Sequence, residues 1–322
     1  MNYRKLGRTG IEVSEISFGA WGIGGGLWQG SDDRESLNAL CRAADLGVNF
    51  IDTALAYGKG HSERLVGRFL KQRKERIHVA TKIPPKNSEW PARPGTKLRE
   101  VFPGRYVRKC TEESLKNLNV ETIDVQQFHV WLDDWNNDPE WFDEVRALKE
   151  EGKIRFFGVS INDHQPSSAL AIVASGKIDI VQVIYNIFDQ SPEGELFPQC
   201  RKHGVGVIAR VPFDEGGLTG RITPETSFPR QDFRHRYFRG DRKREVSEKV
   251  QKLMELLGKG AVTLPELALR FCLHHPSVST VIPGMRTENH VEQNASVSDG
   301  EKLSAQTLSQ LKKHRWEKNF YH

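Results

Sequence analysis

Four side chains in the first 130 residues have the types needed for proton transfer, namely Asp52, Tyr57, Lys82 and His129. A tyrosine with an ordinary pKa of ~10 can donate a proton at neutral pH, whereas the reverse role requires a stabilised phenolate. A lysine ammonium stabilises a phenolate by Coulomb attraction, a carboxylate keeps the lysine charged, and a histidine can hydrogen-bond a substrate oxygen. The set is therefore suited to acid–base chemistry on a polar substrate group.

Two other interpretations of these residues are compatible with their spacing. Polar side chains at strand ends can form a structural ion-pair network without any catalytic role. Lys82 could instead be a Schiff-base nucleophile, as in barrel aldolases, which requires a neutral amine in a desolvated site. Asp52 argues mildly against the second interpretation, because a carboxylate favours the charged amine.

The elements that must position these residues follow a repeated pattern. Eight times, a short β-branched or aromatic run precedes a stretch of helical periodicity, with expected strands near Ser17 and at 48–52, 78–82, 124–130, 155–160, 180–186, 204–210 and 278–284. No linker rich in Pro, Gly or Ser divides the repeats. They predict an α/β fold with a single domain over residues 1–322, a closed (β/α)₈ TIM barrel, whose active sites lie at the carboxyl ends of the strands.

Further segments surround the repeats. A turn at Arg8-Thr9-Gly10 between two alternating segments predicts an N-terminal β-hairpin that closes the barrel floor. Asp32 or Asp33 should cap the first helix, and Gly47 suits its end. Insertions at 84–104 and 212–240 follow strands, so we expect them on the catalytic face.

Charge and cysteine content limit the class of protein. The chain carries 47 Lys and Arg against 42 Asp and Glu, a net charge of +5, which permits an anionic ligand without requiring nucleic acid. Its four cysteines are scattered, so neither a zinc site nor a disulfide framework is expected. The N-terminal residues lack the apolar core of a signal peptide, and no uncharged run suits a membrane span. We therefore expect a cytoplasmic protein that binds neither membrane nor metal.

Six segments make the sequence specific: LGRTGIEVSEISFGAWGIGG, FIDTALAYGKGHSERLVG, VATKI, GKIRFFGVS, GGLTGR and VIPGMRTENHVEQN. Their order resembles that in aldo-keto reductases over nearly the whole chain. The match is closer to the bacterial branch whose last strand ends in Ile-Pro-Gly plus an arginine than to the mammalian aldose reductase branch. The resemblance implies an oxidoreductase that transfers hydride from NADPH to a small-molecule aldehyde or ketone without a metal. It matches Asp52, Tyr57, Lys82 and His129 to the family's tetrad, with Tyr57 as proton donor.

The resemblance also implies where the cofactor lies. Near the nicotinamide it places Gly19, Ala20, Trp21 and Asp52, and around the carboxamide Ser160, Asn162 and Gln182. For the ring-stacking position and the pyrophosphate loop it implies Arg210, Val211, Pro212, Phe213, Gly217 and Leu218. For the adenosine end it implies Gly284, Met285, Arg286, His290, Gln293 and Asn294. Arg286 is a bidentate donor that precedes an expected helix at 287–297, which suits a 2′-phosphate and favours NADPH over NADH.

The chain departs from the family where many members stack an aromatic residue on the nicotinamide, because it has Arg210 there. The charge of this arginine should favour the neutral reduced ring over the cationic oxidised ring. We expect the substrate pocket to be lined by Trp21, Trp28, Tyr57, His129 and Trp131, with Trp90 as a weaker candidate.

Three competing interpretations concern function. The glycine run at 22–26 does not complete the dinucleotide-binding GxGxxG motif. The basic run FRHRYFRGDRKRE at 233–245 superficially suits nucleic acid, although a solvated helix start or an anion-attracting rim explains it better. A non-catalytic NADPH-binding regulatory subunit is the alternative function, since potassium channel beta subunits resemble the same family.

The C-terminal residues 314–322 either fold over the pocket or pack on a barrel helix.

Overall fold

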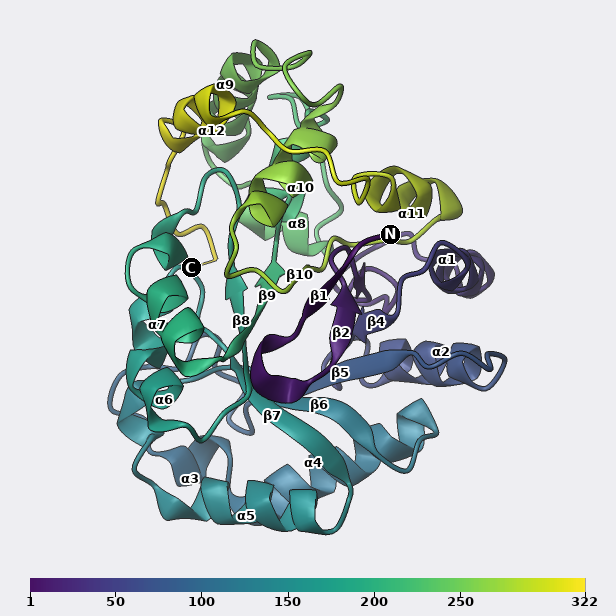
Figure 1. The fold of residues 1–322 in the computed structure, drawn as a ribbon, viewed down its shortest axis with the longest axis vertical. Helices are drawn as coiled ribbons and strands as arrows, with labels where there is room; N and C mark the ends of the chain where they lie inside the picture. The colour runs from purple at the N-terminus through teal and green to yellow at the C-terminus, as the bar shows by residue number, and fades with distance from the viewer. Residues whose placement is uncertain (322) are drawn as a thin grey trace.

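A closed barrel of parallel strands forms the centre of the computed structural model, which describes residues 1–321 (Figure 1). The eight strands follow one another around the sheet in chain order. They are β3 (Phe18–Gly19), β4 (Phe50–Asp52), β5 (His78–Ile83), β6 (Ile123–Phe128), β7 (Ile154–Ser160), β8 (Ile180–Ile184), β9 (Gly206–Arg210) and β10 (Thr280–Val281). Parallel bridges from Ile16 to Val281 and from Gly19 to Gly284 join the first strand to the last. The predicted (β/α)₈ barrel is confirmed.

Helices surround the barrel. They are α1 (Asp33–Asp45), α2 (His61–Leu70), α3 (Leu98–Val101), α4 (Gly104–Leu118), α5 (Pro139–Glu150), α6 (Leu170–Ser175), α7 (Leu196–His203), α8 (Phe233–Tyr237), α9 (Arg242–Met254), α10 (Leu264–His274), α11 (Glu288–Ala295) and α12 (Ala305–Lys312). Among residues 1–321, no helix is long and apolar enough to cross a membrane.

The ends of α1 follow the expected chemistry. Asp32 is the N-cap, and its carboxylate accepts a hydrogen bond of 2.9 Å from the backbone N–H of Glu35. After the helix, Gly47 adopts φ 88°, a left-handed conformation that glycine adopts without strain. Ala39, Leu40 and Ala43 form its buried face, which recurs at the helical spacing.

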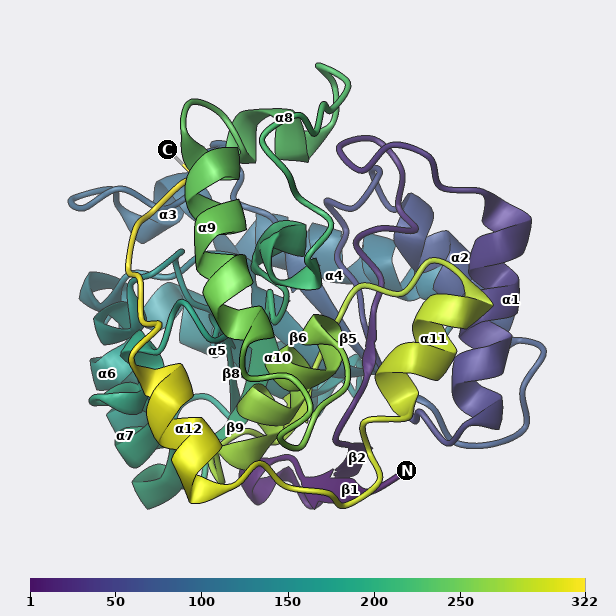
Figure 2. The same ribbon diagram turned by 90° about the horizontal axis from the view of Figure 1, so that it is seen from above.

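The N-terminal hairpin closes one end of the barrel. β1 (Tyr3–Lys5) pairs antiparallel with β2 (Glu12–Ser14). The buried side chains of Leu6, Ile11 and Val13 join a cluster with residues in or next to the barrel strands: Phe50, Ala80, Val125, Ile180, Ile208 and Ile282. The hairpin is thus the expected floor, and Figure 2 shows it at the opposite end of the molecule from α8.

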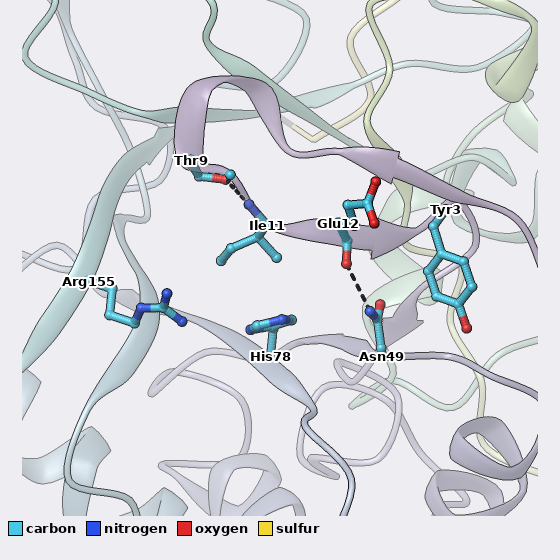
Figure 3. A pocket seen from close by; sticks show the side chains of 8 residues that line it. Tyr3, Thr9, Ile11, Glu12, Asn49, His78 and Arg155 are labelled. Atoms are coloured by element: carbon cyan, nitrogen blue, oxygen red, sulfur yellow. Dashed lines mark hydrogen bonds between the residues drawn. The ribbon is translucent and has the colours of Figure 1, made fainter.

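A cleft of about 560 Å³ lies between this hairpin and the barrel. Figure 3 shows Thr9, Ile11 and Glu12 of the hairpin segment facing His78, at the start of β5, and Arg155, on β7. Because it lies at the amino ends of the strands, this cleft is far from the carboxyl ends where barrel active sites occur.

The carboxyl ends of the strands carry both insertions and the end of the chain. After α12 the chain runs alongside α9 toward the end of the barrel that carries α8 (Figure 2). The backbone N–H of Trp316 donates to the carbonyl of Phe188, over 2.8 Å, in the segment after β8. The C-terminal residues show both expected arrangements: Trp316 and Phe320 pack against Arg242 of α9, while Tyr321 reaches Glu215, in the loop after β9.

Candidate active site

The four proton-transfer residues meet at the carboxyl ends of three adjacent strands. Asp52 is the last residue of β4, Lys82 lies near the end of β5, and His129 follows β6. Lys82 Nζ donates to Asp52 Oδ2 over 2.6 Å and to the carbonyl of Thr53 over 2.8 Å. It also lies 3.4 Å from the hydroxyl of Tyr57, which the loop after β4 carries back over the strand ends.

Burial governs the charges of the inner pair. Burial raises the pKa of the Asp52 carboxyl, although attraction to Lys82 opposes it. Burial lowers the pKa of the Lys82 ammonium, and Asp52 opposes that shift. A further hydrogen bond of 2.9 Å from Gln182 Nε2 holds Asp52 Oδ1. Gln182 therefore holds the Asp52 carboxylate in place, and the carboxylate in turn fixes the position of the Lys82 ammonium.

Tyr57 keeps its proton in this environment. Burial raises its pKa well above 10, Asp52 and Glu215 add to the rise, and Arg210 opposes it. Lys82 thus lies next to the Tyr57 hydroxyl as expected. The pKa of Tyr57 is nevertheless raised by burial, so its phenolate is not favoured. The geometry supplies a neutral phenol with an ammonium beside it, which suits proton donation.

His129 is held neutral. Burial lowers its pKa well below 6.5, and the positive charges of Lys82 and Arg210 lower it further. Its Nδ1 is buried and has no hydrogen-bond partner among the described residues. A neutral imidazole beside Tyr57, with ring centroids 5.8 Å apart, can hydrogen-bond an uncharged oxygen without competing for its proton.

Aromatic rings wall this position. Trp21 stacks on Tyr57 at 6.0 Å between centroids and meets Trp28 edge-on at 5.5 Å. Trp90, from the first insertion, stands edge-on to His129 at 4.4 Å. Phe233 of α8 contacts Trp21 at 5.0 Å. Residue type and spacing alone did not indicate Phe233, which stands at the start of the basic run.

Trp131 lies elsewhere, which corrects its assignment to the pocket. Its ring is fully buried against Phe128, Trp135 and Trp141, and its indole N–H donates to Asp133. Trp131 lies two residues after His129, but β6 ends at Phe128, so the alternation of side chains along a strand does not extend to residue 131. Trp90 occupies the position beside His129 instead.

Residues expected around the carboxamide present unpaired acceptors. Ser160 and Gln182 lie in register on β7 and β8, and both are buried. Asn162 Oδ1 and Gln182 Oε1 are buried without a partner among residues 1–321. A carboxamide NH₂ can satisfy two such acceptors, so these residues fit a nicotinamide.

Arg210 ends β9 and is held by neighbouring groups. Its guanidinium donates to Asp163 Oδ1 over 2.7 Å and to the carbonyl of Ile161 over 3.1 Å. Burial lowers its pKa, but the attraction of Asp163, Tyr321 and Glu215 together with the hydrogen bond to Asp163 outweighs burial and leaves the pKa raised. Its Nε has no partner among the described residues. The sequence did not predict Asp163 as the partner of Arg210, because no spacing or motif links the two residues along the chain.

The expected pyrophosphate loop has an unusual backbone. Val211, Asp214 and Glu215 have positive φ values of 56°, 50° and 54°, which cost energy in residues other than glycine. The loop folds around the carbonyl of Phe213, which accepts from the N–H groups of Gly216 and Leu218. Gly217 is required because a Cβ there would lie 2.5 Å from Asp214 Oδ2.

The expected adenosine end lies between the first loop and α11. Arg286 Nη1 donates to the carbonyl of Gln29 over 2.9 Å, and the absence of a side chain at Gly22 leaves room for it. No carboxylate pairs with Arg286 among residues 1–321. Around it, Met285 and Asn294 are buried, His290 is half-buried, and Gly284 and Gln293 are exposed.

The basic run 233–245 is divided between separate environments. Arg234 pairs with Asp232 and lies 4.4 Å from the ring of Trp28. Arg242 is buried and pairs with Asp214 over 2.6 Å. These two arginines are at least partly buried and paired with carboxylates, whereas Arg236, Arg239 and Arg244 are exposed. Within the described residues, no group of three or more His, Cys, Asp or Glu side chains could hold a metal ion.

Comparison with known proteins supports one family. A model described as the Aldo/keto reductase family matches residues 15–315. The chain is 30% identical over 308 residues to the aldo-keto reductase YhdN of Bacillus subtilis, covering 92% of this chain and 89% of that protein. It is 30% identical over 304 residues to the NADH-specific methylglyoxal reductase of Escherichia coli, covering 90% and 91%. Among solved structures, the glycerol dehydrogenase AKR11B4 of Gluconobacter oxydans aligns with a TM-score of 0.80 and 29% identity, covering 97% of this chain and 94% of that one.

Proposed function

Because this chain belongs to the aldo/keto reductase family, we propose that it reduces an aldehyde or ketone to an alcohol with NADPH, and that Tyr57 donates the proton. The observation that carries the proposal is the chain of contacts from Asp52 through Lys82 to the hydroxyl of Tyr57, at 2.6 and 3.4 Å. The cofactor, when bound, supplies the hydride.

The chain's own residues account for the other half of the reaction. The neutral phenol of Tyr57 and the imidazole of His129 polarise the substrate oxygen by hydrogen bonding. As the phenol loses its proton, the nearby Lys82 ammonium offsets the developing negative charge. Asp52 and the carbonyl of Thr53 keep that ammonium in place. No step requires a metal ion in this scheme.

Preference for NADPH over NADH rests on Arg286. Arg234 is neutralised by Asp232, whereas Arg286 has no carboxylate partner among residues 1–321 and precedes the N-terminus of α11. An unpaired guanidinium beside helix N–H groups suits a 2′-phosphate. The NADH-specific relative makes this preference the point to test first.

The test is a fluorescence titration with NADPH and NADH, followed by oxidation of the bound cofactor with a panel of aldehydes, diketones and sugars. We expect tighter binding of NADPH and turnover with at least one carbonyl class. Arg286→Ala should remove most of the difference between the two affinities. Equal affinities in the parent protein contradict the NADPH assignment.

The regulatory-subunit alternative makes a different prediction for the same titration. Such a protein binds NADPH tightly and shows negligible steady-state turnover with every carbonyl tested. The loss of turnover in Tyr57→Phe, with cofactor affinity unchanged, separates the enzyme from a mere nucleotide-binding subunit.

A further inference from the structure

A group of paired polar side chains, separate from the four proton-transfer residues, lies on three loops and the C-terminal residues. This group, the polar wall, consists of Asp163, His164, Asp189, Arg210, Glu215 and Tyr321. Arg210 pairs with Asp163, and the hydroxyl of Tyr321 donates to Glu215 Oε1 over 2.6 Å. His164 Nδ1 pairs with Asp189 Oδ2 over 2.6 Å. Acid–base chemistry at Tyr57 uses none of these pairs.

Several polar atoms of this wall are unpaired. Arg210 Nε and His164 Nε2 are buried and have no partner among the described residues. Glu215 is 7% exposed, and its Oε2 accepts no hydrogen bond from residues 1–321. The wall thus contains an N–H donor and a carboxyl acceptor within electrostatic range of each other. Each lacks a protein partner in the described part of the chain, and burying such a polar group without a hydrogen bond costs free energy.

A chain of ring contacts links the polar wall to the catalytic tyrosine. Aromatic rings connect them in sequence: Tyr57 to Trp21 at 6.0 Å, Trp21 to Phe233 at 5.0 Å, and Phe233 to Tyr321 at 5.8 Å. Arg210 and Glu215 also act on the pKa of Tyr57 in opposite directions, so both charges lie within electrostatic range of its hydroxyl.

Arg242 contacts the residues that precede Tyr321 and Glu215 in the chain. The guanidinium of Arg242 pairs with Asp214 on one side and lies 3.6 Å from the ring of Phe320 and 4.3 Å from that of Trp316. Because Asp214 precedes Glu215 and Phe320 precedes Tyr321, one buried arginine restricts the backbone on both sides of the Tyr321–Glu215 hydrogen bond. The pair is therefore positioned before any substrate arrives.

We propose that Glu215, Tyr321 and Arg210 bind hydroxyl groups of the carbonyl substrate, so that hydroxylated aldehydes and ketones are preferred over their unsubstituted alkyl analogues. This proposal rests on the proposed reductase function. A hydroxyl both donates and accepts, so it satisfies Glu215 Oε2 and Arg210 Nε together. An ammonium substituent is opposed by Arg210, and a carboxylate by Glu215 and Asp163, whereas an alkyl group leaves both atoms unpaired.

The test compares kcat/KM for glyceraldehyde and propanal, which have the same carbon chain and differ by two hydroxyls. We expect the parent protein to favour glyceraldehyde, and Glu215→Ala to lower that preference roughly ten- to hundred-fold. Glu215→Gln should restore part of it, because an amide oxygen still accepts, and Tyr321→Phe should lower it less. Each aldehyde is partly hydrated in solution, to the same extent for every variant. A comparison of the glyceraldehyde-to-propanal ratio of kcat/KM between variants is therefore not affected by hydration.

Two controls keep the outcomes separate. Lys318→Ala removes an exposed pair with Glu245 from the same C-terminal segment and should leave the preference unchanged. NADPH affinity, measured by fluorescence, should stay within twofold in the Glu215 and Tyr321 variants. If these variants weaken NADPH binding and leave the aldehyde ratio unchanged, the wall serves the cofactor and the proposal is overturned.

The parent protein separates this proposal from the reductase function itself. Turnover of both aldehydes with equal kcat/KM overturns hydroxyl recognition and leaves the reductase standing. Absence of turnover with every carbonyl tested, despite NADPH binding, overturns the reductase and the hydroxyl recognition with it.

Discussion

The guanidinium of Arg210 donates to the carboxylate of Asp163 over 2.7 Å, at the position where the chain replaces an aromatic ring by a cation. This pair offsets much of the charge that would otherwise act on a nicotinamide ring. The charge of Arg210 should therefore raise the affinity for NADPH relative to NADP⁺ only slightly in the parent protein. The effect should be larger once Asp163 is replaced by a neutral residue.

Asp163→Asn tests this relationship, since it keeps a hydrogen-bond acceptor for Arg210 while removing the negative charge. We expect the affinity for NADPH relative to NADP⁺ to rise by about 1 kcal/mol, roughly fivefold. Arg210→Met should move the ratio in the opposite direction. The measurement is fluorescence or calorimetric titration with each cofactor form, and an unchanged ratio in both variants contradicts the electrostatic account.

Tyr57→Phe should reduce kcat by at least about 100-fold, because it removes the proton donor while preserving the ring that stacks on Trp21. NADPH affinity should stay close to that of the parent. Tyr106→Phe is a matched control, since that hydroxyl donates only to the carbonyl of Pro84 in the adjacent insertion. Comparable losses in the two variants argue against Tyr57 as the donor.

Asp52→Asn should shift the alkaline limb of the pH–rate profile to lower pH. Burial already lowers the pKa of Lys82 and Asp52 opposes that shift, so removing the carboxylate lowers the pKa further. The ammonium form is then lost at a lower pH as pH rises. The same variant leaves the buried Lys82 charge without its carboxylate partner. Its free energy of unfolding should therefore fall by about 3–5 kcal/mol, which lowers the melting temperature. A profile identical to that of the parent contradicts the role assigned to this pair.

Asp124 on β6 should make the barrel floor sensitive to acid. Burial alone raises its pKa, but hydrogen bonds from His78 and the backbone N–H of Val79 outweigh burial and leave the pKa below 3.8. Its ionised form therefore stabilises the fold above pH ~3.8, and that contribution is lost as pH falls through the lower folded-state pKa. Asp124→Asn should cost about 1.5–3 kcal/mol of unfolding free energy at pH 7 and flatten the acid dependence seen by urea denaturation. An undiminished acid dependence in this variant would falsify the assignment.

Trp90 and Trp131 should respond differently to substitution. Trp90 is 45% exposed and stands against His129, so Trp90→Ala should raise KM several-fold with little change in melting temperature. Trp131 is fully buried, so Trp131→Ala should cost about 3–5 kcal/mol of unfolding free energy. Steady-state kinetics and thermal unfolding measure the two effects. The reverse pattern would return Trp131 to the pocket.

The sequence by itself determined the barrel and the shared position of the four proton-transfer residues. Each strand is marked by local composition, and the carboxyl ends of neighbouring parallel strands must meet at one end of the barrel. Asp52, Lys82 and His129 lie at the ends of three consecutive strands, so their proximity follows from chain order. The cap at Asp32 and the hairpin are equally local, and they were predicted for the same reason.

Only the tertiary structure decided which groups complete these residues. Asp163, after β7, reaches Arg210, at the end of β9, across the intervening strand β8. Tyr321 reaches Glu215 from the far end of the chain, and Trp90 rather than Trp131 stands beside His129. These contacts join loops that are 47 or 106 residues apart in the first two cases, where no periodicity links the partners. Their positions depend on how the loops pack over the barrel, because neither strand alternation nor helical spacing extends beyond the end of an element.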